Sequence, residues 1–449
     1  MPDIDRACGA ASSKYLPFVE EIECGIIQRN RACDEREAIK KLVSLDAGVA
    51  VEKLIPAYVR SAQGIFFTEE SLANRVSVIF SSEISIASSF FDPACGAGNL
   101  LLAIAKKYPL KSNLRDTLMF WGGKFGGCDL NENFVLATKL RLIALAAYRH
   151  GSGAVSKVLL SEFLSFFKFF EVGDYLLAAN GSSFDCLVAN PPFGHVVVSD
   201  EVGWSSGRTQ QAAIFITHIL KNAIPGQKVA AILPDVLRSG TRYSKWRDFV
   251  GSQCDNVHVD VYGRFSKTVD VDVFFLCFSK KIVPNHLGSF SSTEWTHAFE
   301  IGVKGRVRLG DFFTVRVGPV VPHRLVSSEV TVPYLNAKNS PPFGTAENFE
   351  RIAFKGTLYN PPFVLVRRTS SPSDKKRLVT TLVLEGKPTA IENHLLILSP
   401  KDGRVEACIA LAAALQGEDI HVQLNEAIRC RHLTTGSLSN LQVLGMGYE

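Results

Sequence analysis

The sequence predicts an α/β protein built on a doubly wound, Rossmann-like sheet, with a helical extension before it and a strand-rich α+β domain after it. Short apolar segments that suit buried strands alternate with helical segments over residues 59–285. Residues 1–58 show helical periodicity without strand signals, and residues 284–293 are rich in Ser and Gly, as linkers are. Residues 296–449 contain many strand-like segments joined by short loops. We therefore expect three parts along the chain.

The first informative element is Asp92-Pro93-Ala94-Cys95-Gly96-Ala97-Gly98-Asn99, between an expected strand end at residues 88–91 and an expected helix from Leu100. Gly96 and Gly98 permit tight turning and close approach of the backbone to a ligand. Strand, glycine turn and helix together form the nucleoside-binding corner of an α/β sheet. The glycine spacing is neither that of a dinucleotide fingerprint nor that of a P-loop, which disfavours a dinucleotide or ATP as ligand.

The next expected strand ends at Asp129, before a helix over residues 133–148. An acid at this place can accept hydrogen bonds from both hydroxyls of a ribose. A carboxylate there can also simply cap the helix that follows. Both interpretations fit the sequence.

The second informative element is Asn190-Pro191-Pro192-Phe193, which follows the apolar run 184–189. The Asn190 side-chain oxygen and the Pro191 carbonyl can accept hydrogen bonds from an aromatic amine, because proline offers a carbonyl and no N–H. Two successive prolines fix two φ angles and hold both acceptors rigidly. Phe193 offers a face on which a base can stack. A plain turn is the alternative, but the glycine corner upstream favours methyl transfer to an exocyclic amine.

On these two elements the chain resembles an adenine-N6 DNA methyltransferase of the γ order, of the TaqI type with a C-terminal target-recognition domain. The resemblance extends over about residues 60–445. It implies S-adenosyl-L-methionine as the cofactor and double-stranded DNA as the partner. The implied catalytic residues are Asn190, Pro191, Pro192 and Phe193, and the implied cofactor-binding residues of the two strand ends are Asp92, Ala94, Cys95, Gly96, Gly98 and Asp129.

Weaker matches extend the resemblance. Residues 64–69 resemble a Gly-x-Phe/Tyr-Thr-Pro element, in which Thr68 would contact the methionine part of the cofactor, although Glu69 replaces the proline. Residues 160–164 resemble an Asp-Phe-Leu element, so that Glu162 and Phe163 would contact the cofactor adenine. Because a paired adenine must leave the duplex to react, we expect it to stack on Phe193 and Phe265. Ordinary core packing is the alternative for Phe265.

The domain from residue 296 is expected to recognise the DNA target. From residue 300 onward the chain has 18 Lys and Arg against 14 Asp and Glu, within a net charge of +5 for the whole protein. Basic side chains in this part can hold phosphates or read guanine edges, or can belong to solvated loops. The expected DNA contacts are Arg367, Arg368, Lys375, Lys376 and Arg377.

Two patterns in this domain are interpreted as chance. Asn360-Pro361-Pro362-Phe363 repeats the tetrapeptide, but it precedes an expected strand and has no glycine turn at a suitable distance before it. Asp374, Glu385 and Lys387 have the spacing of a nuclease core, which short charged loops often produce. A nuclease is therefore expected on a separate polypeptide.

Composition agrees with an enzyme of the cytoplasm, associated with the nucleoid. The chain has no uncharged apolar run of about eighteen residues that would cross a membrane, and no apolar core near its start that would make a signal peptide. Its ten cysteines contain no Cys-x-x-Cys pair, which disfavours a metal site or a disulfide framework.

Three functions stay open at this point. The first is site-specific methylation of adenine N6 in DNA, in a restriction-modification setting with a restriction endonuclease as partner. The second is methylation of an RNA base or of a protein glutamine, because an amide nitrogen poses the same chemical problem. The third is a non-catalytic DNA-recognition subunit. The long C-terminal region disfavours the glutamine enzymes, and the intact pair of motifs disfavours the third.

Overall fold

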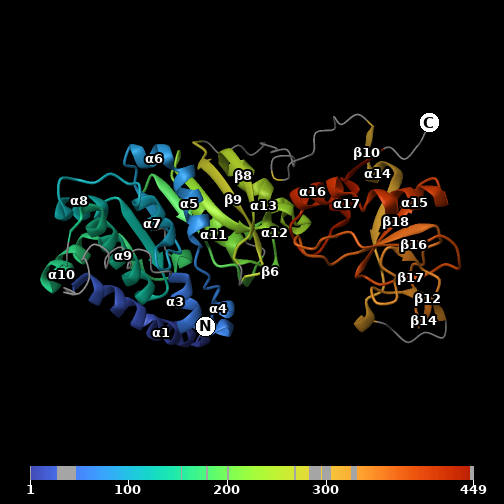
Figure 1. Ribbon diagram of the computed structural model, residues 1–449, viewed down its shortest axis with the longest axis horizontal. Helices are drawn as coiled ribbons and strands as arrows, with labels where there is room; N and C mark the ends of the chain where they lie inside the picture. Colours follow the sequence, from blue (N-terminus) through green and yellow to red (C-terminus); the bar gives the residue numbers. More distant parts are fainter. Residues whose placement is uncertain are drawn as a thin grey trace. The chain divides into compact units, whose positions relative to one another are not determined.

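In the computed structural model, the protein forms two compact units (Figure 1). Unit 1 comprises Met1–Leu237 with Lys245–Phe290, and unit 2 comprises Arg238–Ser244 with Ser291–Glu449. The linker expected at residues 284–293 lies outside the described residues. The structure describes residues 2–27, 47–152, 154–177, 181–199, 202–266, 269–282, Trp295, 305–324 and 331–444.

Unit 1 contains a seven-stranded sheet in the order β3-β2-β1-β4-β7-β9-β8. Only β9 runs against its neighbours β7 and β8; the pairs β1–β2, β2–β3, β1–β4 and β4–β7 are parallel. The chain therefore winds outward from β1 in one direction and then returns to build the other half from β4. This confirms the doubly wound, Rossmann-like fold. The strands are β1 (Phe90–Asp92), β2 (Phe125–Asp129), β3 (Phe170–Val172), β4 (Cys186–Ala189), β7 (Lys228–Pro234), β8 (Cys254–Arg264) and β9 (Asp272–Lys280).

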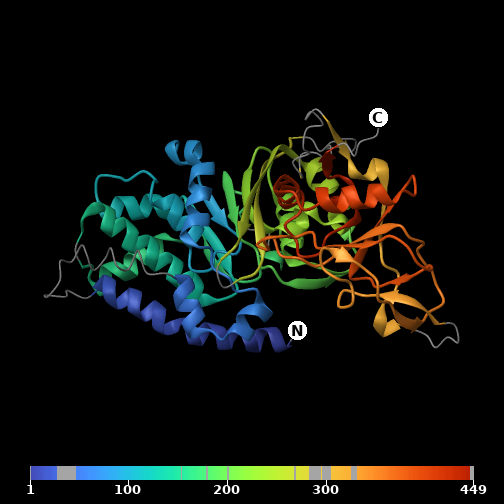
Figure 2. The same cartoon turned by 45° about the vertical axis from the view of Figure 1, so that its right-hand side comes forward.

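Helices cover both faces of this sheet (Figures 1 and 2). On one side α9 is the longest, and it starts where the Asn131 side chain accepts hydrogen bonds from the Asn133 and Phe134 amides. Its many buried Ala and Leu residues allow close packing against α7 and α8. On the other side Trp246 of α13 donates to the Ala213 carbonyl of α11 at 3.3 Å. These helices are α5 (Glu70–Ile79), α6 (Ser81–Ser85), α7 (Asn99–Ala105), α8 (Leu114–Gly122), α9 (Glu132–His150), α10 (Lys157–Phe166), α11 (Gln211–Asn222), α12 (Asp235–Ser239) and α13 (Ser244–Gln253).

The N-terminal extension is part of unit 1. Its helices are α1 (Pro2–Ile27), α3 (Ala47–Leu54) and α4 (Ala57–Gln63). In Figure 1, α1 lies along α9. Tyr15 of α1 is fully buried, with its ring 4.8 Å from that of Phe134 and 6.1 Å from that of Phe67. The extension therefore supports the segment that carries Thr68.

After β4 the chain forms a two-stranded antiparallel ribbon of β5 (His195–Val198) and β6 (Gly207–Gln210). The amide of Gln211 donates to the Gly194 carbonyl at 2.8 Å, so the base of this ribbon closes directly behind Phe193.

Unit 2 is strand-rich, as expected. A five-stranded sheet has the order β11-β18-β15-β16-β13, and a three-stranded sheet has the order β14-β12-β17. Buried apolar residues of α15 and α16 pack on the larger sheet. Its elements are β10 (Arg306–Arg308), α14 (Leu309–Phe312), β11 (Phe313–Val317), β12 (Thr331–Leu335), β13 (Gly344–Thr345), β14 (Glu350–Ala353), β15 (Phe363–Arg367), β16 (Thr380–Val383), β17 (Ala390–Ile391), β18 (Leu395–Pro400), α15 (Val405–Ala414), α16 (Glu418–Ala427), α17 (Thr435–Ser439) and β19 (Gln442–Leu444).

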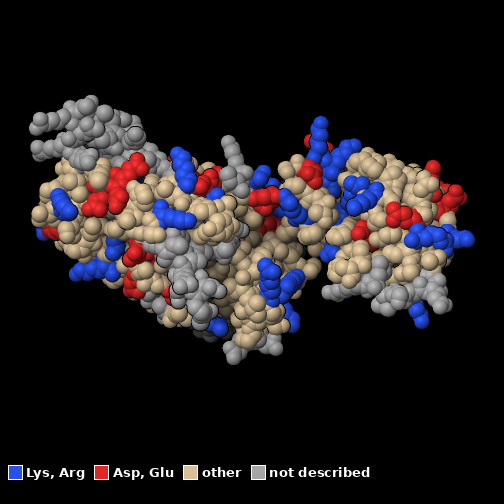
Figure 3. Space-filling model, turned by 90° about the horizontal axis from the view of Figure 1, so that it is seen from below, with Lys and Arg blue, Asp and Glu red and all other residues tan. Residues whose placement is uncertain are grey.

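Charged side chains of both signs are interspersed over the face shown in Figure 3. This agrees with the small net charge of +5. Within the described residues, no helix is both long and apolar enough to cross a membrane.

Candidate active site

Four neighbouring strands of unit 1 end in polar residues at one edge of the sheet. Asp92 of β1 pairs with Gly127, so it lies beside Asp129 at the end of β2. Asp129 in turn pairs with Val172 of β3, and Asp174 follows that strand. Asn190 follows β4, whose Leu187 pairs with Phe91. Because the sheet changes its winding direction between β1 and β4, this edge is the place where open α/β sheets bind ligands.

The glycine turn after β1 is fixed by backbone hydrogen bonds. The Asp92 carboxylate accepts from the Ala94 amide at 3.0 Å, and the Gly96 amide donates to Asp129 Oδ2 at 2.9 Å. The Cys95 amide donates to the Cys128 carbonyl at 2.9 Å. Asp129 therefore joins the turn to β2.

Gly96 and Gly98 have φ values of 51° and 81°, which side chains other than glycine rarely adopt. A Cβ at Gly96 would lie 2.8 Å from the Phe67 ring, and one at Gly98 would lie 2.7 Å from Thr138 Cγ2. Both glycines thus make room for other parts of the protein. A side chain at Gly98 would press on α9, where a ligand was expected to be the neighbour.

Burial dominates the electrostatics of this edge. Asp92 is 1% exposed, and burial together with the nearby negative charge of Asp129 raises its pKa to about 8. The pKa of Asp129 rises to about 6, since burial outweighs the hydrogen bonds that it accepts from the Asn131, Gly96 and Leu130 amides. Burial also raises the pKa of the Cys95 thiol, so this side chain is a neutral packing group.

The side-chain amide of Asn190 is held in one orientation. Its Nδ2 donates to Thr68 Oγ1 at 3.0 Å and to the Phe66 carbonyl at 3.3 Å. Because a carbonyl can only accept, the nitrogen must face Phe66, and the amide oxygen must face away from that segment. Asn190 Oδ1 is enclosed and has no hydrogen-bond partner among the described residues. A buried acceptor without a partner costs about 1–3 kcal/mol, which an incoming amine donor would remove.

Residues 64–68 connect the turn at residues 190–193 to the glycine turn. Gly64 has a φ of 67°, and a Cβ there would lie 2.6 Å from Pro192 Cβ. Thr68 is buried, and its carbonyl accepts from Asn99 Nδ2 at 2.6 Å. Asn99 Oδ1 accepts from Arg141 of α9 at 2.6 Å. The sequence indicated Thr68, whereas the positioning roles of Gly64 and Asn99 become visible only in the structure.

Phe193 and Phe265 are brought together as rings in direct contact. Their centroids are 5.2 Å apart at an angle of 80°, and Phe265 is 1% exposed. A base does not fit between two rings in edge-to-face contact. Phe265 is thus packed in the core and supports Phe193 in this arrangement, and stacking of a base on either ring stays a prediction.

The structure places Glu162 away from the strand ends. It lies on α10, and its Oε1 is 2.5 Å from Arg115 Nη2 of α8, so it links two helices. Phe163 is 4% exposed and packs in the core. The acid that follows β3 is Asp174, and the Gly173 amide beside it donates to the Asp129 carbonyl at 2.9 Å. The sequence Asp174-Tyr175-Leu176, acid–aromatic–Leu two residues after Phe170-Glu171-Val172, is the signal that could have identified it.

An apolar surface accompanies the acids. Leu130 follows Asp129 and is 54% exposed, and Leu177 follows the Asp174 turn and is 83% exposed. Acids flanked by exposed apolar side chains suit a nucleoside, whose ribose offers hydroxyl donors and whose base offers a flat apolar face. The residues at this edge therefore fit the expected S-adenosylmethionine.

The basic residues expected to contact DNA differ in exposure. Lys375 and Lys376 are exposed, and Arg367 and Arg368 are half-buried at the end of β15. Arg377 is fully buried. Its guanidinium donates to Asn425 Oδ1 and to the carbonyls of Ile428 and Cys430 at 2.6–2.8 Å. The expectation for Arg377 is therefore wrong in this conformation: the group holds unit 2 together and has no surface to offer a phosphate.

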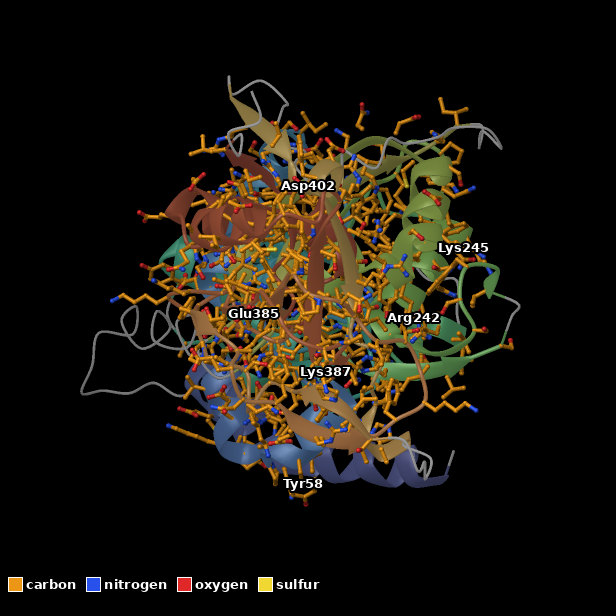
Figure 4. The ribbon with its side chains drawn as sticks, turned by 90° about the vertical axis from the view of Figure 1, so that its right-hand side faces the viewer. Tyr58, Arg242, Lys245, Glu385, Lys387 and Asp402 are labelled. Atoms are coloured by element: carbon orange, nitrogen blue, oxygen red, sulfur yellow. The ribbon has the colours of Figure 1, made fainter. Side chains whose placement is uncertain are left out.

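The residues of the two patterns interpreted as chance are either exposed on unit 2 or buried in its core. Asn360 is exposed, and Phe363 is fully buried in β15. Asp374, Glu385 and Lys387 are all exposed, and Glu385 and Lys387 lie in the loop after β16 (Figure 4). Among the described residues, no group of three or more His, Cys, Asp or Glu side chains is arranged to hold a metal.

Residues 47–255 match the family described as N-6 DNA Methylase, and this range contains the whole strand edge described above. A comparison with curated proteins gave no match. Unit 1 thus has the Rossmann-like fold of methyltransferases, and its matched range has the sequence pattern of a family that acts on DNA. The match identifies the family, and it does not distinguish the γ order or the TaqI type within that family.

The solved structures that are similar to the chain include three restriction-modification proteins. The type IIL restriction-modification enzyme MmeI, in complex with DNA, shares 11% identity with a TM-score of 0.51, covering 90% of this chain and 70% of MmeI. The type IIG restriction endonuclease BpuSI shares 12% identity with a TM-score of 0.42, covering 99% and 71%. The methyltransferase subunit of a type I restriction-modification system from Streptococcus thermophilus shares 17% with a TM-score of 0.33, covering 54% and 52%. At this identity the likeness to MmeI concerns the fold.

Proposed function

We propose that this protein transfers a methyl group from S-adenosyl-L-methionine to the N6 amine of a specific adenine in double-stranded DNA, as an enzyme of the γ order and TaqI type. The observation that carries the proposal is the Asn190 amide, which two hydrogen bonds hold in one orientation. Its enclosed oxygen has no hydrogen-bond partner among the described residues. The match of residues 47–255 to N-6 DNA methylases supports the same conclusion.

The cofactor would bind along the strand ends. Asp129 would accept from the ribose hydroxyls, and Leu130 would lie against the base. Thr68 would be near the methionine part, because its carbonyl reaches Asn99 at the start of α7. Asp174 replaces Glu162 in our proposal as the acceptor for the adenine amino group, because it follows β3 beside Asp129. S-adenosylmethionine supplies an electrophilic methyl group on a sulfonium.

Asn190 and Pro191 would prepare the acceptor amine. The Asn190 Oδ1 atom and the Pro191 carbonyl each accept one N–H of the adenine amine, which draws the nitrogen toward sp³ geometry and directs its lone pair. The C–N bond then forms while the S–C bond breaks, and the cationic amine loses a proton to water. A strong general base is not needed. Phe193, supported by Phe265, would stack on the base after it leaves the duplex.

Unit 2 is proposed to recognise the DNA sequence, and a separate restriction endonuclease is the proposed partner. The proposed setting is restriction-modification in the cytoplasm. RNA bases and protein glutamines are the competing acceptors, since each offers an amine or amide nitrogen to the same pair of carbonyl oxygens. A non-catalytic recognition subunit would have no use for an oriented Asn190 amide.

An assay with labelled methyl groups tests the function directly. Duplex DNA, RNA and protein are offered in parallel, and we expect label on the adenines of duplex DNA only. The exposed Asn360 provides a matched control, because Asn360→Ala changes the same tetrapeptide in unit 2. Label on RNA or protein alone, or equal activity of Asn190→Ala and wild type, would overturn the proposal. A 2-aminopurine at the target should also brighten on binding as it unstacks.

A further inference from the structure

One edge of unit 2 gathers basic and amide side chains from three segments. Arg367 ends β15 and pairs with Leu395 of β18. The Arg368 amide donates to the His394 carbonyl at 2.9 Å, and the Leu433 amide donates to the Arg368 carbonyl at 2.8 Å. Residues 367–369, 393–394 and 431–433 therefore meet at this place, which we call the β15 edge.

The charge of the β15 edge is positive. The pKa of His432 lies below its usual range because of partial burial and because Arg368, His394 and Arg431 are close to it. His394, Arg431 and His432 are exposed. The neighbouring acid, Glu392, is engaged elsewhere, since its Oε2 accepts from the Ala337 amide at 3.0 Å. A polyanion would therefore meet attraction at this edge.

Three polar atoms of the β15 edge lack partners. Arg367 Nε, Arg368 Nε and Asn393 Oδ1 are enclosed and make no hydrogen bond to any part of the chain that the structure describes. Such groups are rare in folded proteins. Arg368 and Asn393 are half-buried and in contact with each other, so their unpaired atoms indicate a site that a polar ligand completes. The side chains are positioned by their backbones. Arg368 Nη1 donates to the Asn393 carbonyl at 3.3 Å, so the two residues are in direct contact.

Resting on the proposed function, which supplies DNA as the partner, we propose that the β15 edge reads bases of the target sequence. Arg368 contacts a guanine, and Asn393 contacts an adenine, because these side chains match the donor and acceptor patterns of those bases in the major groove. An uncharged amide has little to gain from a phosphate. The exposed Lys375 and Lys376 suit phosphates instead, since their flexible chains carry charge without fixed geometry.

The experiment uses the full-length protein and a library of duplexes with randomised sequence. Wild-type methylation of the library defines the target. Asn393→Ala keeps the backbone carbonyl that Arg368 uses, and Arg368→Lys keeps the charge. We expect each variant to lose discrimination at one base pair, by about 5- to 150-fold, while methylation of relaxed sites continues. Lys375→Gln is the control: it should weaken all sequences alike and lower the slope of log affinity against log salt by about 1.

Binding titrations with duplexes that differ by one base pair separate this inference from the proposed function, because they require no methyl transfer. Selective binding that the two variants lose supports the reading role, even if the wild type transfers no methyl group. Unchanged selectivity of both folded variants, with methylation intact in the wild type, would overturn the reading role and leave the enzymatic proposal standing. Non-selective binding by the wild type would overturn the reading role as well.

Discussion

The tetrapeptide Asn-Pro-Pro-Phe occurs in both units, and its two copies have opposite surroundings. The first, starting at Asn190, follows the parallel strand β4 and lies at the sheet edge where β1, β2 and β3 also end. The second, starting at Asn360, precedes the antiparallel strand β15. Asn190 is oriented by two hydrogen bonds, whereas Asn360 is exposed. Phe193 is half-buried, whereas Phe363 is fully enclosed and cannot stack on a ligand.

The difference shows that the tetrapeptide alone specifies no chemistry. Two prolines hold a carbonyl and an amide in fixed directions, but a reaction also needs a second ligand within reach. Parallel strands supply this, because their carboxyl ends lie at one edge of the sheet and place Asp92, Asp129 and Asp174 at the same edge as Asn190. An antiparallel sheet alternates its strand ends and gathers no such set.

The largest contrast is expected when the asparagine of each copy is removed. Asn190→Ala should lower kcat for methyl transfer on the order of 10²-fold or more, by analogy with the loss of one oriented polar group in other active sites. DNA binding should change little, because it is spread over many contacts. Asn360→Ala should leave kcat unchanged. Steady-state kinetics of the two variants would contradict the comparison if they lost similar activity.

A second contrast concerns the segment that supports the first copy. Gly64→Ala places a Cβ 2.6 Å from Pro192, so it should displace the catalytic turn and lower kcat by about 10- to 100-fold. Gly151 is the matched control, because it has a similar φ of 63° but nothing within 4 Å of the added atom. Gly151→Ala should show the backbone strain alone, as a lower unfolding temperature with normal kcat. Equal kinetics of both variants would remove the segment from the site.

A third test compares the two acids proposed for the cofactor. Asp174→Ala should weaken S-adenosylmethionine binding by about 10-fold or more, because a hydrogen bond to a charged group contributes about 1.5–3 kcal/mol. Glu162→Gln should leave the affinity near that of wild type, since Glu162 pairs with Arg115. Titration calorimetry measures both. A loss of affinity in Glu162→Gln without one in Asp174→Ala would restore the first assignment.

The smallest expected effect is on stability. Asp92, beside the first copy, has a pKa of about 8 in the folded protein against an ordinary value of 3.8. The folded state holds the proton more tightly, so this contribution to stability is complete below about pH 4 and is lost as the pH rises toward 8. Asp92→Asn cannot ionise. Its unfolding temperature relative to wild type should therefore increase by a few °C between about pH 5 and pH 8. Parallel profiles of the two proteins would contradict the buried acid.

The pattern of apolar and polar residues in the sequence was sufficient to predict most of the fold. Each of β1, β4 and β7 is a short apolar run, and the helix after Asp129 begins at a capping asparagine and is rich in Ala and Leu. These are local signals, so they are visible without a structure. The acid after β3 was missed because β3 has only three residues, two of them exposed. A helix nearby offered the similar string Glu162-Phe163-Leu164.

By itself the sequence determined the α/β class, the glycine turn after β1 and the position of Asn190 after a buried strand. These features depend on neighbours within a few residues, where side-chain pattern and backbone preference act directly. Only the tertiary structure decided that Asp174 lies at the strand edge, that Phe265 supports Phe193 from the core, and that Arg377 is buried. Those roles depend on contacts between segments far apart in the chain, and a residue's own type does not reveal which segment will cover it.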